Sequence, residues 1–344
     1  MIAKTKNEIK KIINLLDKII DLDIYYLETY VNFYLNEVSE YNIFFKKNKG
    51  KIFFIPYIKS LIKNSKNYYD IETPYGYGGP IINTDDEKFI QESWNKFLYL
   101  LNNERIVAGL FRFNPFYNTK SFKNLEHLEI EKQRKVVILD LTKSEELIYK
   151  NFSKDNKNKI KKAIKSKIFL NKCKNPKELC EFSKIYNKRM KENKALDMYH
   201  FENDYFQKLS SLGRKNIEIY ILKKEDEVIG GAIVLKNENF AHYHLSACKS
   251  EYFSLGPNNF MRYQVILDLK GQNLKMINFG GGKTNDISDT LFEFKKKFSN
   301  DTLWFHIGKC IFNKSIYDDI IVNWEKDNDE KKNIFDKYIL KYRF

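Results

Sequence analysis

Residues 217–247 read IEIYILKKEDEVIGGAIVLKNENFAHYHLSA and contain three apolar runs separated by two short polar turns. The runs cover residues 217–222, 228–235 and 240–247. Each run is rich in the β-branched and aromatic residues that favour strands. The turns at 223–227 and 236–239 are too short for a crossover, so they predict hairpins. This stretch therefore predicts three consecutive antiparallel strands.

The residues on both sides of these strands alternate between helical and strand-like patterns. Helical spacing predicts helices over residues 143–167, 176–193, 258–269 and 315–344. Short apolar runs predict strands over residues 275–279 and 303–305, between the last two helices. Pro257 stands at the start of the third helix, where its missing N–H costs nothing. The second half is thus predicted to be a sheet with helices packed against it.

The first half has a looser version of the same order. Helical spacing from Ile9 to Ile20 is followed by strand-like runs at 51–57 and 67–71, a helix over 85–101, and buried strands over 106–113 and 136–140. We therefore predict two domains, residues 1–145 and 146–344, although no Pro/Gly-rich linker separates them. The expected fold class is α/β with mixed sheets and flanking helices.

Composition narrows the class of protein. The chain has 344 residues and is 43% hydrophobic, which is enough for a core and excludes a disordered chain. Lys and Arg number 60 and Asp and Glu 45, which gives a net charge of +15. This charge suits a polyanionic partner, such as RNA, a phosphorylated precursor or anionic lipid. A coding bias toward Lys, Asn and Ile is the competing explanation, because these residues are abundant throughout.

Four cysteines, Cys173, Cys180, Cys248 and Cys310, are scattered without a C-x-x-C pair. They are expected to be reduced thiols rather than disulfides or zinc ligands, so no metal is predicted. No apolar run is long enough to cross a bilayer. Charged residues interrupt the N-terminal stretch, which is expected to be an amphipathic helix and not a signal peptide. We expect a cytoplasmic protein, with the inner face of the membrane as an alternative location.

Five short motifs occur in order between residues 72 and 299. They are ETPYGYGGP at 72–80, HLS at 244–246, GPNNFM at 256–261, FGGGK at 279–283 and LFEFKKKFS at 291–299. As a set, they resemble the signatures of FemABX-type aminoacyl and acyl transferases and of related acetyltransferase domains in the GNAT superfamily. The predicted order of helices and strands is similar to that of the acyl-CoA N-acyltransferase fold. The resemblance implies tandem GNAT-like domains, an N-terminal one and a C-terminal FemAB-like one.

The resemblance also implies an activity. FemABX enzymes transfer an amino acid from aminoacyl-tRNA to an amine of a peptidoglycan precursor, and their relatives transfer acyl groups to amines of surface glycans. By this likeness, the chain is expected to form an amide between an activated acyl group and an amine of a cell-envelope precursor. No bound cofactor is implied, and the acyl donor would be aminoacyl-tRNA or an acyl-CoA.

Residues 249–260, KSEYFSLGPNNF, depart from the usual GNAT pyrophosphate loop because they contain a single glycine. This departure puts conventional acetyl-CoA binding in doubt and favours aminoacyl-tRNA as the donor. The N-terminus of the helix at Asn258 and Asn259 could still bind a phosphate. In GNAT folds, splayed middle strands expose backbone amides to the acyl group, and here we expect these strands to be 228–235 and 240–247.

Two residues are candidates for catalysis. His242 and His244 alternate on a predicted strand and should share a face, and His244, which lies in a motif, is the better candidate general base. Hydrogen-bonded structural histidines are the alternative. Lys295 matches the Lys of the family's FK-containing motif, which lies at the acyl-transfer centre. Its alternative is a solvated helix end, because Lys295 begins a run of three lysines.

The candidate substrate-binding residues lie in loops and at helix ends, where function concentrates. They are Glu72, Tyr75, Tyr77, Gly78, Gly79, Asn258, Asn259, Gly280, Gly281, Gly282, Lys283 and Phe294. The Tyr-Gly loop offers aromatic faces and backbone donors to a nucleotide-sugar or glycan, with Asp70 and Glu72 placed to orient an ammonium group. Structural turns, packed on tyrosines or capped by an aspartate, are the alternative for both glycine-rich segments.

Two other functions stay open on the sequence. One is an acetyl-CoA-dependent sugar N-acetyltransferase, which shares the chemistry but not the donor. The other is a non-catalytic basic module that binds RNA or a membrane surface, and it predicts binding that weakens steeply with salt. The expected partners are an amine-bearing precursor linked to a nucleotide, lipid or glycan, with tRNA and the membrane surface as further options.

Overall fold

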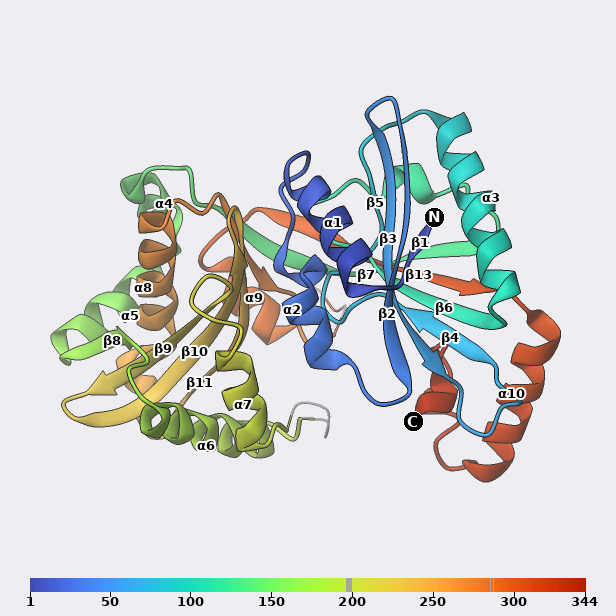
Figure 1. The fold of residues 1–344 in the computed structure, drawn as a ribbon. Coiled ribbons are helices and arrows are strands. Elements are labelled where there is room, and N and C mark those ends of the chain that lie inside the picture. Colours follow the sequence, from blue (N-terminus) through green and yellow to red (C-terminus); the bar gives the residue numbers. More distant parts are fainter. Residues whose placement is uncertain (196–199, 285, 287) are drawn as a thin grey trace. The chain divides into compact units, whose positions relative to one another are not determined.

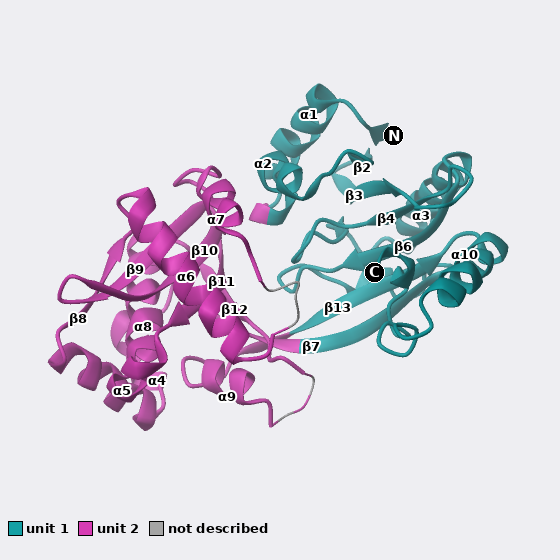
Figure 2. Ribbon diagram, turned by 90° about the horizontal axis from the view of Figure 1, so that it is seen from below, with its two compact units in different colours: residues 1–20, 25–134, 304–344 teal, residues 21–24, 135–303 magenta. Residues whose placement is uncertain are grey.

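The computed structural model describes residues 1–195, 200–284, 286 and 288–344. Two compact units divide the chain (Figure 2). Unit 1 contains residues 1–20, 25–134 and 304–344, and unit 2 contains residues 21–24 and 135–303. The strands β7 (Leu128–Asp140) and β13 (Thr302–Ile311) each run from one unit into the other. Within the described residues, no helix combines the length and the apolar character needed to cross a membrane.

Unit 1 is a mainly antiparallel sheet with helices. Its other elements are β1 (Ile2–Ala3), α1 (Lys6–Asp17), α2 (Glu28–Val31), β2 (Ser39–Asn48), β3 (Lys51–Leu61), β4 (Tyr69–Glu72), β5 (Ile81–Ile82), α3 (Glu87–Asn103), β6 (Ile106–Arg112) and α10 (Lys314–Asp327). The strand order is β1-β2-β3-β4-β6-β13, with β5 beside β3 and with β4 and β6 parallel. The apolar stripe of α3, including Trp94 and Phe97, packs into an aromatic core against this sheet.

Unit 2 contains the three predicted strands and their flanking helices (Figure 1). Its elements are α4 (Glu145–Asn151), α5 (Lys154–Lys165), β8 (Ile168–Lys172), α6 (Pro176–Glu192), α7 (Asn203–Ser210), β9 (Ile217–Lys224), β10 (Glu227–Asn237), β11 (Phe240–Cys248), α8 (Pro257–Gly271), β12 (Met276–Gly280) and α9 (Thr290–Lys296). The strand order is β7-β12-β11-β10-β9-β8, and within this order only β11 and β12 are parallel.

Helices cover both faces of the unit 2 sheet. Ala232 of β10 lies in the core cluster that α8 completes with Phe260, Met261 and Val265. The neighbouring Gly231 faces the other way, toward the ring of Phe182 in α6. A Cβ at Gly231 would lie 2.8 Å from that ring, so glycine lets α6 approach the strand. Every strand predicted in residues 217–247 is present.

Two predicted helices differ from the structure. The helix expected over 143–167 is two helices, α4 and α5, because Ser153 caps α5 by accepting a hydrogen bond from the Asn156 N–H. The helix expected over 315–344 ends at Asp327. The residues around this end, KDNDEKKN at 326–333, are rich in Asp and Asn, which favour turns over helix interiors.

The expected division into domains at residues 1–145 and 146–344 stays a prediction. The two compact units are each made of segments that are not continuous in sequence. Residues 304–344 belong to unit 1, because β13 pairs with β6 from Ile307 to Ile311. Residues 21–24 belong to unit 2, where Leu22 accepts a hydrogen bond from the Asn237 side chain at 2.6 Å. These exchanges join segments far apart in the sequence, which no local pattern indicates.

Candidate active site

The sheet of unit 2 opens between β11 and β12. These parallel strands pair only from Phe240–Met276 to His242–Asn278. Beyond that point β11 continues to Cys248 beside β10, while Gly280 of β12 pairs with β7. The expectation that the splayed strands are 228–235 and 240–247 is therefore wrong, because these two form a continuous antiparallel pair. Tyr243 and Phe279 are the first residues of each strand past the parting.

His244 occupies a β-bulge. Ile233 of β10 is opposite Leu245 and Val234 is opposite Tyr243, so His244 is the extra residue between them. Its Nε2 shares a hydrogen bond of 3.1 Å with the hydroxyl of Tyr205 in α7. Burial, and secondarily His242, lower the pKa of His244 to about 4. His244 is thus neutral near pH 7 and weakly basic, and its role as general base stays a prediction.

His242 pairs with a residue that the sequence analysis missed. The carboxylate of Asp23, which is wholly buried, lies 2.7 Å from His242 Nε2. The segment 21–24 brings Asp23 to β11 across 219 positions of sequence. A buried carboxylate beside imidazole fixes the orientation of the ring. No motif or spacing could have indicated Asp23, because residues 21–24 are a short segment of unit 2 between two segments of unit 1.

The lowered pKa of His244 predicts a dependence of stability on pH. The unfolded chain binds this proton near the ordinary pKa of 6.5 and the folded chain only near 4. The stabilisation is therefore present above about pH 6.5 and is lost as the pH falls toward about 4. His244→Gln removes the titrating group and keeps a hydrogen-bonding side chain for Tyr205. Urea denaturation across this window should give a shallower pH dependence for H244Q, by about one proton. Equal slopes for the two proteins would contradict the assignment.

The glycine turn after β12 is built around Asp289. The carboxylate of Asp289 accepts hydrogen bonds from the backbone N–H groups of Lys283 at 2.7 Å and Thr284 at 2.9 Å. It also caps α9 through the N–H groups of Leu291 and Phe292. A Cβ on Gly282 would lie 2.5 Å from this carboxylate. Burial opposes ionisation of Asp289, but these N–H groups hold its pKa below the ordinary value. The glycine turn is therefore capped by an aspartate, as in the structural alternative considered for this segment.

Lys295 lies against the same turn. Its Nζ donates a hydrogen bond of 2.6 Å to the Gly281 carbonyl. Gly280 has a positive φ of 75°, and a Cβ there would lie 3.2 Å from the ammonium. Phe294 is partly buried against the core, whereas Lys283 is exposed. The structure therefore brings together four predicted site residues in unit 2, which are Lys295, Phe294, Gly280 and Gly281.

The N-terminus of α8 is covered by α5. Gly256 has a φ of 76°, and a Cβ there would lie 2.6 Å from the Lys159 carbonyl oxygen of α5. The side chain of Asn259 donates to Asn156 Oδ1 at 2.9 Å, and Asn156 in turn donates to the Lys297 carbonyl at 3.0 Å. Asn259 is buried and Asn258 is half-buried. The helix N-terminus that was predicted to bind phosphate is packed against protein, and its role stays a prediction.

In unit 1, the Tyr-Gly loop packs on other tyrosines. The backbone carbonyls of Tyr75 and Tyr77 accept hydrogen bonds from Tyr30 at 3.2 Å and Tyr26 at 3.3 Å. Gly76 has a φ of 90° and lies under the ring of Tyr25. Tyr75 is 39% exposed, and its ring centre lies 5.4 Å from that of Tyr34, so its role in substrate binding stays a prediction.

Two further glycines of this loop serve close packing. A Cβ on Gly78 would lie 2.8 Å from the Pro74 ring, and one on Gly79 would lie 2.5 Å from the Arg112 carbonyl. Both contacts are within the protein. Their role in substrate binding stays a prediction.

Glu72 is already paired with two cations. Its carboxylate lies 2.8 Å from Arg112 Nη2 and also contacts Arg343. Burial opposes ionisation of Glu72, but these guanidinium groups hold its pKa below the ordinary value. Asp70, which is 1% exposed, pairs with Arg343 as well. These carboxylates tie β4 to the C-terminal segment, which leaves them less suited to orient an ammonium group of a substrate.

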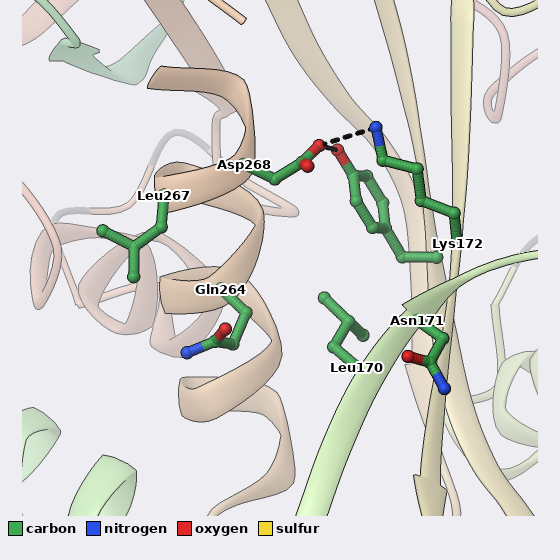
Figure 3. Close-up of a pocket in the computed structure, with 7 residues that line it drawn as sticks. Leu170, Asn171, Lys172, Gln264, Leu267 and Asp268 are labelled. Atoms are coloured by element: carbon green, nitrogen blue, oxygen red, sulfur yellow. Dashed lines mark hydrogen bonds and ion pairs between the residues drawn. The ribbon is translucent and has the colours of Figure 1, made fainter. Parts of the chain in front are cut away.

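A pocket of about 250 Å³ lies elsewhere in unit 2, between β8, β9 and α8 (Figure 3). Its polar centre is Asp268, which accepts hydrogen bonds from Tyr220 at 2.7 Å and pairs with Lys172 at 3.2 Å. Gln264 and Leu267 line the same side. None of the predicted site residues lines it. We therefore place the candidate active site at the parting of β11 and β12 and not in this pocket.

Comparison with known proteins agrees with this geometry. Residues 150–296, from α4 to the end of α9, match the model of the acetyltransferase (GNAT) domain. The predicted resemblance is confirmed at this level, as is the mixed α/β fold class. The match supports an acyltransferase, and acyl-CoA is the donor that GNAT domains use. No curated protein matches the sequence.

Solved structures with the same fold cover most of the chain. The crystal structure of FemX is similar with a TM-score of 0.71 and 12% identity, over 85% of this chain and 93% of FemX. A conserved protein of unknown function from Bacteroides thetaiotaomicron has a TM-score of 0.54 and 12% identity, over 84% of this chain and 90% of its own. L-PGS from Bacillus licheniformis has a TM-score of 0.53 and 13% identity, over 81% of this chain and 85% of L-PGS. At these identities the likeness shows the fold.

Proposed function

We propose that the protein is an N-acyltransferase of FemABX type. It forms an amide between an activated acyl or aminoacyl group and an amine of a cell-envelope precursor. The acceptor is a peptidoglycan peptide or an amino sugar of a surface polysaccharide. The observation that carries the proposal is Lys295, held at the Gly281 carbonyl beside the parting of β11 and β12 in a GNAT domain. The similarity in fold to FemX supports the choice of substrate class.

The chemistry asks little of the protein in covalent terms. A neutral amine attacks an ester or thioester carbonyl, an oxyanion forms, and the leaving group takes a proton. The ammonium of Lys295 supplies a positive charge for the oxyanion or the leaving group. His244, whose Nε2 shares a hydrogen bond with the Tyr205 hydroxyl, is neutral at pH 7 and is the proposed general base. Phe294 and Tyr243 would shield the reaction from water.

The donor is proposed to be an aminoacyl ester such as aminoacyl-tRNA. In support, α5 covers the N-terminus of α8, where the pyrophosphate of an acyl-CoA would otherwise meet free N–H groups. Thermal unfolding with and without acetyl-CoA tests this choice. A ligand at 100 times its Kd stabilises by about 2.7 kcal/mol, which raises Tm by a few degrees. Such a rise would favour the acetyl-CoA-dependent sugar N-acetyltransferase, whereas no rise is expected for an aminoacyl-tRNA enzyme.

Lys295→Ala should lower the rate of amide formation about 100-fold while circular dichroism shows an intact fold. The reason is the loss of a cation at the proposed reaction centre. Lys296→Ala is the matched control, because Lys296 is the next residue on α9 and is partly exposed. It should retain nearly full activity. Full activity of K295A would refute the assignment of Lys295.

The non-catalytic alternative has its own signature. It predicts no turnover with either donor, together with RNA or vesicle binding that weakens steeply with salt and is unchanged in K295A. A cytoplasmic location, at the inner face of the membrane, follows from the proposed precursor. Fractionation of cells with labelled protein would test this location.

A further inference from the structure

Arg262 is a buried cation surrounded by aromatic rings. It projects from α8, is 4% exposed, and lies over four rings that we call the aromatic box. The distances from its guanidinium carbon to the ring centres are 4.4 Å for Tyr243, 5.5 Å for Phe279, 4.9 Å for Phe294 and 5.2 Å for Phe298. Such cation–π contacts offset part of the cost of burying the charge.

Two of the three guanidinium nitrogens of Arg262 have no hydrogen-bond partner among the described residues. Among the described residues, its Nε and Nη1 are wholly buried and have no acceptor. No carboxylate of the described residues forms an ion pair with Arg262. Burial lowers the pKa of its guanidinium. Ring faces attract the cation but do not replace acceptors in the guanidinium plane. A buried, unpaired guanidinium is costly, so its retention calls for a partner.

The aromatic box lies in the buried core of unit 2, next to the parting of β11 and β12. Tyr243 and Phe279 are the first residues of β11 and β12 beyond their parting. Phe294 and Phe298 flank Lys295 in and just after α9, and the three elements adjoin in unit 2 (Figure 2). The guanidinium thus faces the strands of the parting and the helix that carries Lys295.

We propose that Arg262 is a binding residue for an anionic group, a carboxylate or a phosphate, of a substrate at the parting of β11 and β12. The anion accepts the N–H donors of the guanidinium in its plane, while the aromatic box holds the guanidinium from its faces. The assignment of this anion to a substrate rests on the proposed function. The binding itself does not, because it can be measured without turnover.

Anion titrations of the intact protein, followed by thermal unfolding and calorimetry, test this site. The carboxylate probes are acetate and succinate, and the phosphate probes are inorganic phosphate and pyrophosphate. Wild type should show a saturable rise in Tm with one of the two classes, which identifies the group. Arg262→Met fills the box with an apolar side chain and should fold with unchanged or higher stability. It should lose the rise or require about 10- to 100-fold more anion.

A protein of net charge +15 also binds anions non-specifically, so a matched control is needed. Lys162→Met removes one exposed cation from α5 and should leave the titration unchanged. Arg262→Lys keeps the charge and should show a weakened but saturable rise, which also covers the case that R262M does not fold. Absence of a saturable rise in wild type, or equal rises in wild type and the Arg262 variants, would overturn the proposal. Saturable binding that depends on Arg262, in a protein that shows no acyl transfer, would refute only the proposed function.

Discussion

Replacing Arg343 by alanine is expected to lower the free energy of unfolding by about 3–5 kcal/mol, because it strips a buried carboxylate of its partner. Asp70 is 1% exposed, and Arg343 reaches it through Nε, at 3.1 Å from Oδ2, and through Nη2. Glu72 also loses a contact but keeps Arg112 at 2.8 Å, so Asp70 carries most of the effect. Urea denaturation measures the change.

The pH dependence of this loss identifies its cause. Burial raises the pKa of Asp70, and Arg343 opposes that rise. Without Arg343 the pKa rises further, so folded R343A binds a proton that the unfolded chain releases, and its stability increases as the pH falls. The deficit should therefore be smaller at about pH 5 than at about pH 8. Lys326→Ala removes an exposed cation from α10 and should change stability by less than about 0.5 kcal/mol. A deficit that is independent of pH would point to lost packing instead.

Arg343 also illustrates what the sequence could not indicate. Local patterns predicted the strands at 217–222, 228–235 and 240–247, because apolar runs and short turns act within a few residues. The pairing of Asp70 with Arg343 spans 273 positions and that of Asp23 with His242 spans 219. No periodicity connects residues so distant, and both carboxylates look like ordinary surface residues in the sequence.

The candidate site was partly predictable for a similar reason. Lys295 and the glycine turn are neighbours in a motif, and the structure brings Lys295 to Gly281. The motif could not tell that Asp289 fills the turn, or that a bulge at His244 breaks the alternation on which a shared face with His242 depended. Arg262 was missed because a helix pattern gives no sign of whether an arginine faces solvent or an aromatic core.

Gly256→Ala is expected to lower the free energy of unfolding by about 2–5 kcal/mol, the second largest effect that we predict. The left-handed backbone at a φ of 76° costs an alanine about 1–2 kcal/mol. The added Cβ would lie 2.6 Å from the Lys159 carbonyl oxygen, and overpacking of this kind costs about 1–3 kcal/mol. Because that oxygen belongs to the backbone of α5, relief requires α5 to move away from α8.

Gly271→Ala is the matched control in the same helix, because a Cβ there meets no atom within 4 Å and the φ is not positive. It should be neutral or stabilise by up to about 1 kcal/mol. The two variants separate stability from donor choice. If α5 excludes an acyl-CoA from the N-terminus of α8, the displacement of α5 in G256A should expose N–H groups and allow acetyl-CoA to raise Tm. G271A should not respond, as expected for wild type. A response of all three proteins, or stability of G256A equal to that of G271A, would show that the contact between Gly256 and Lys159 does not close this helix terminus.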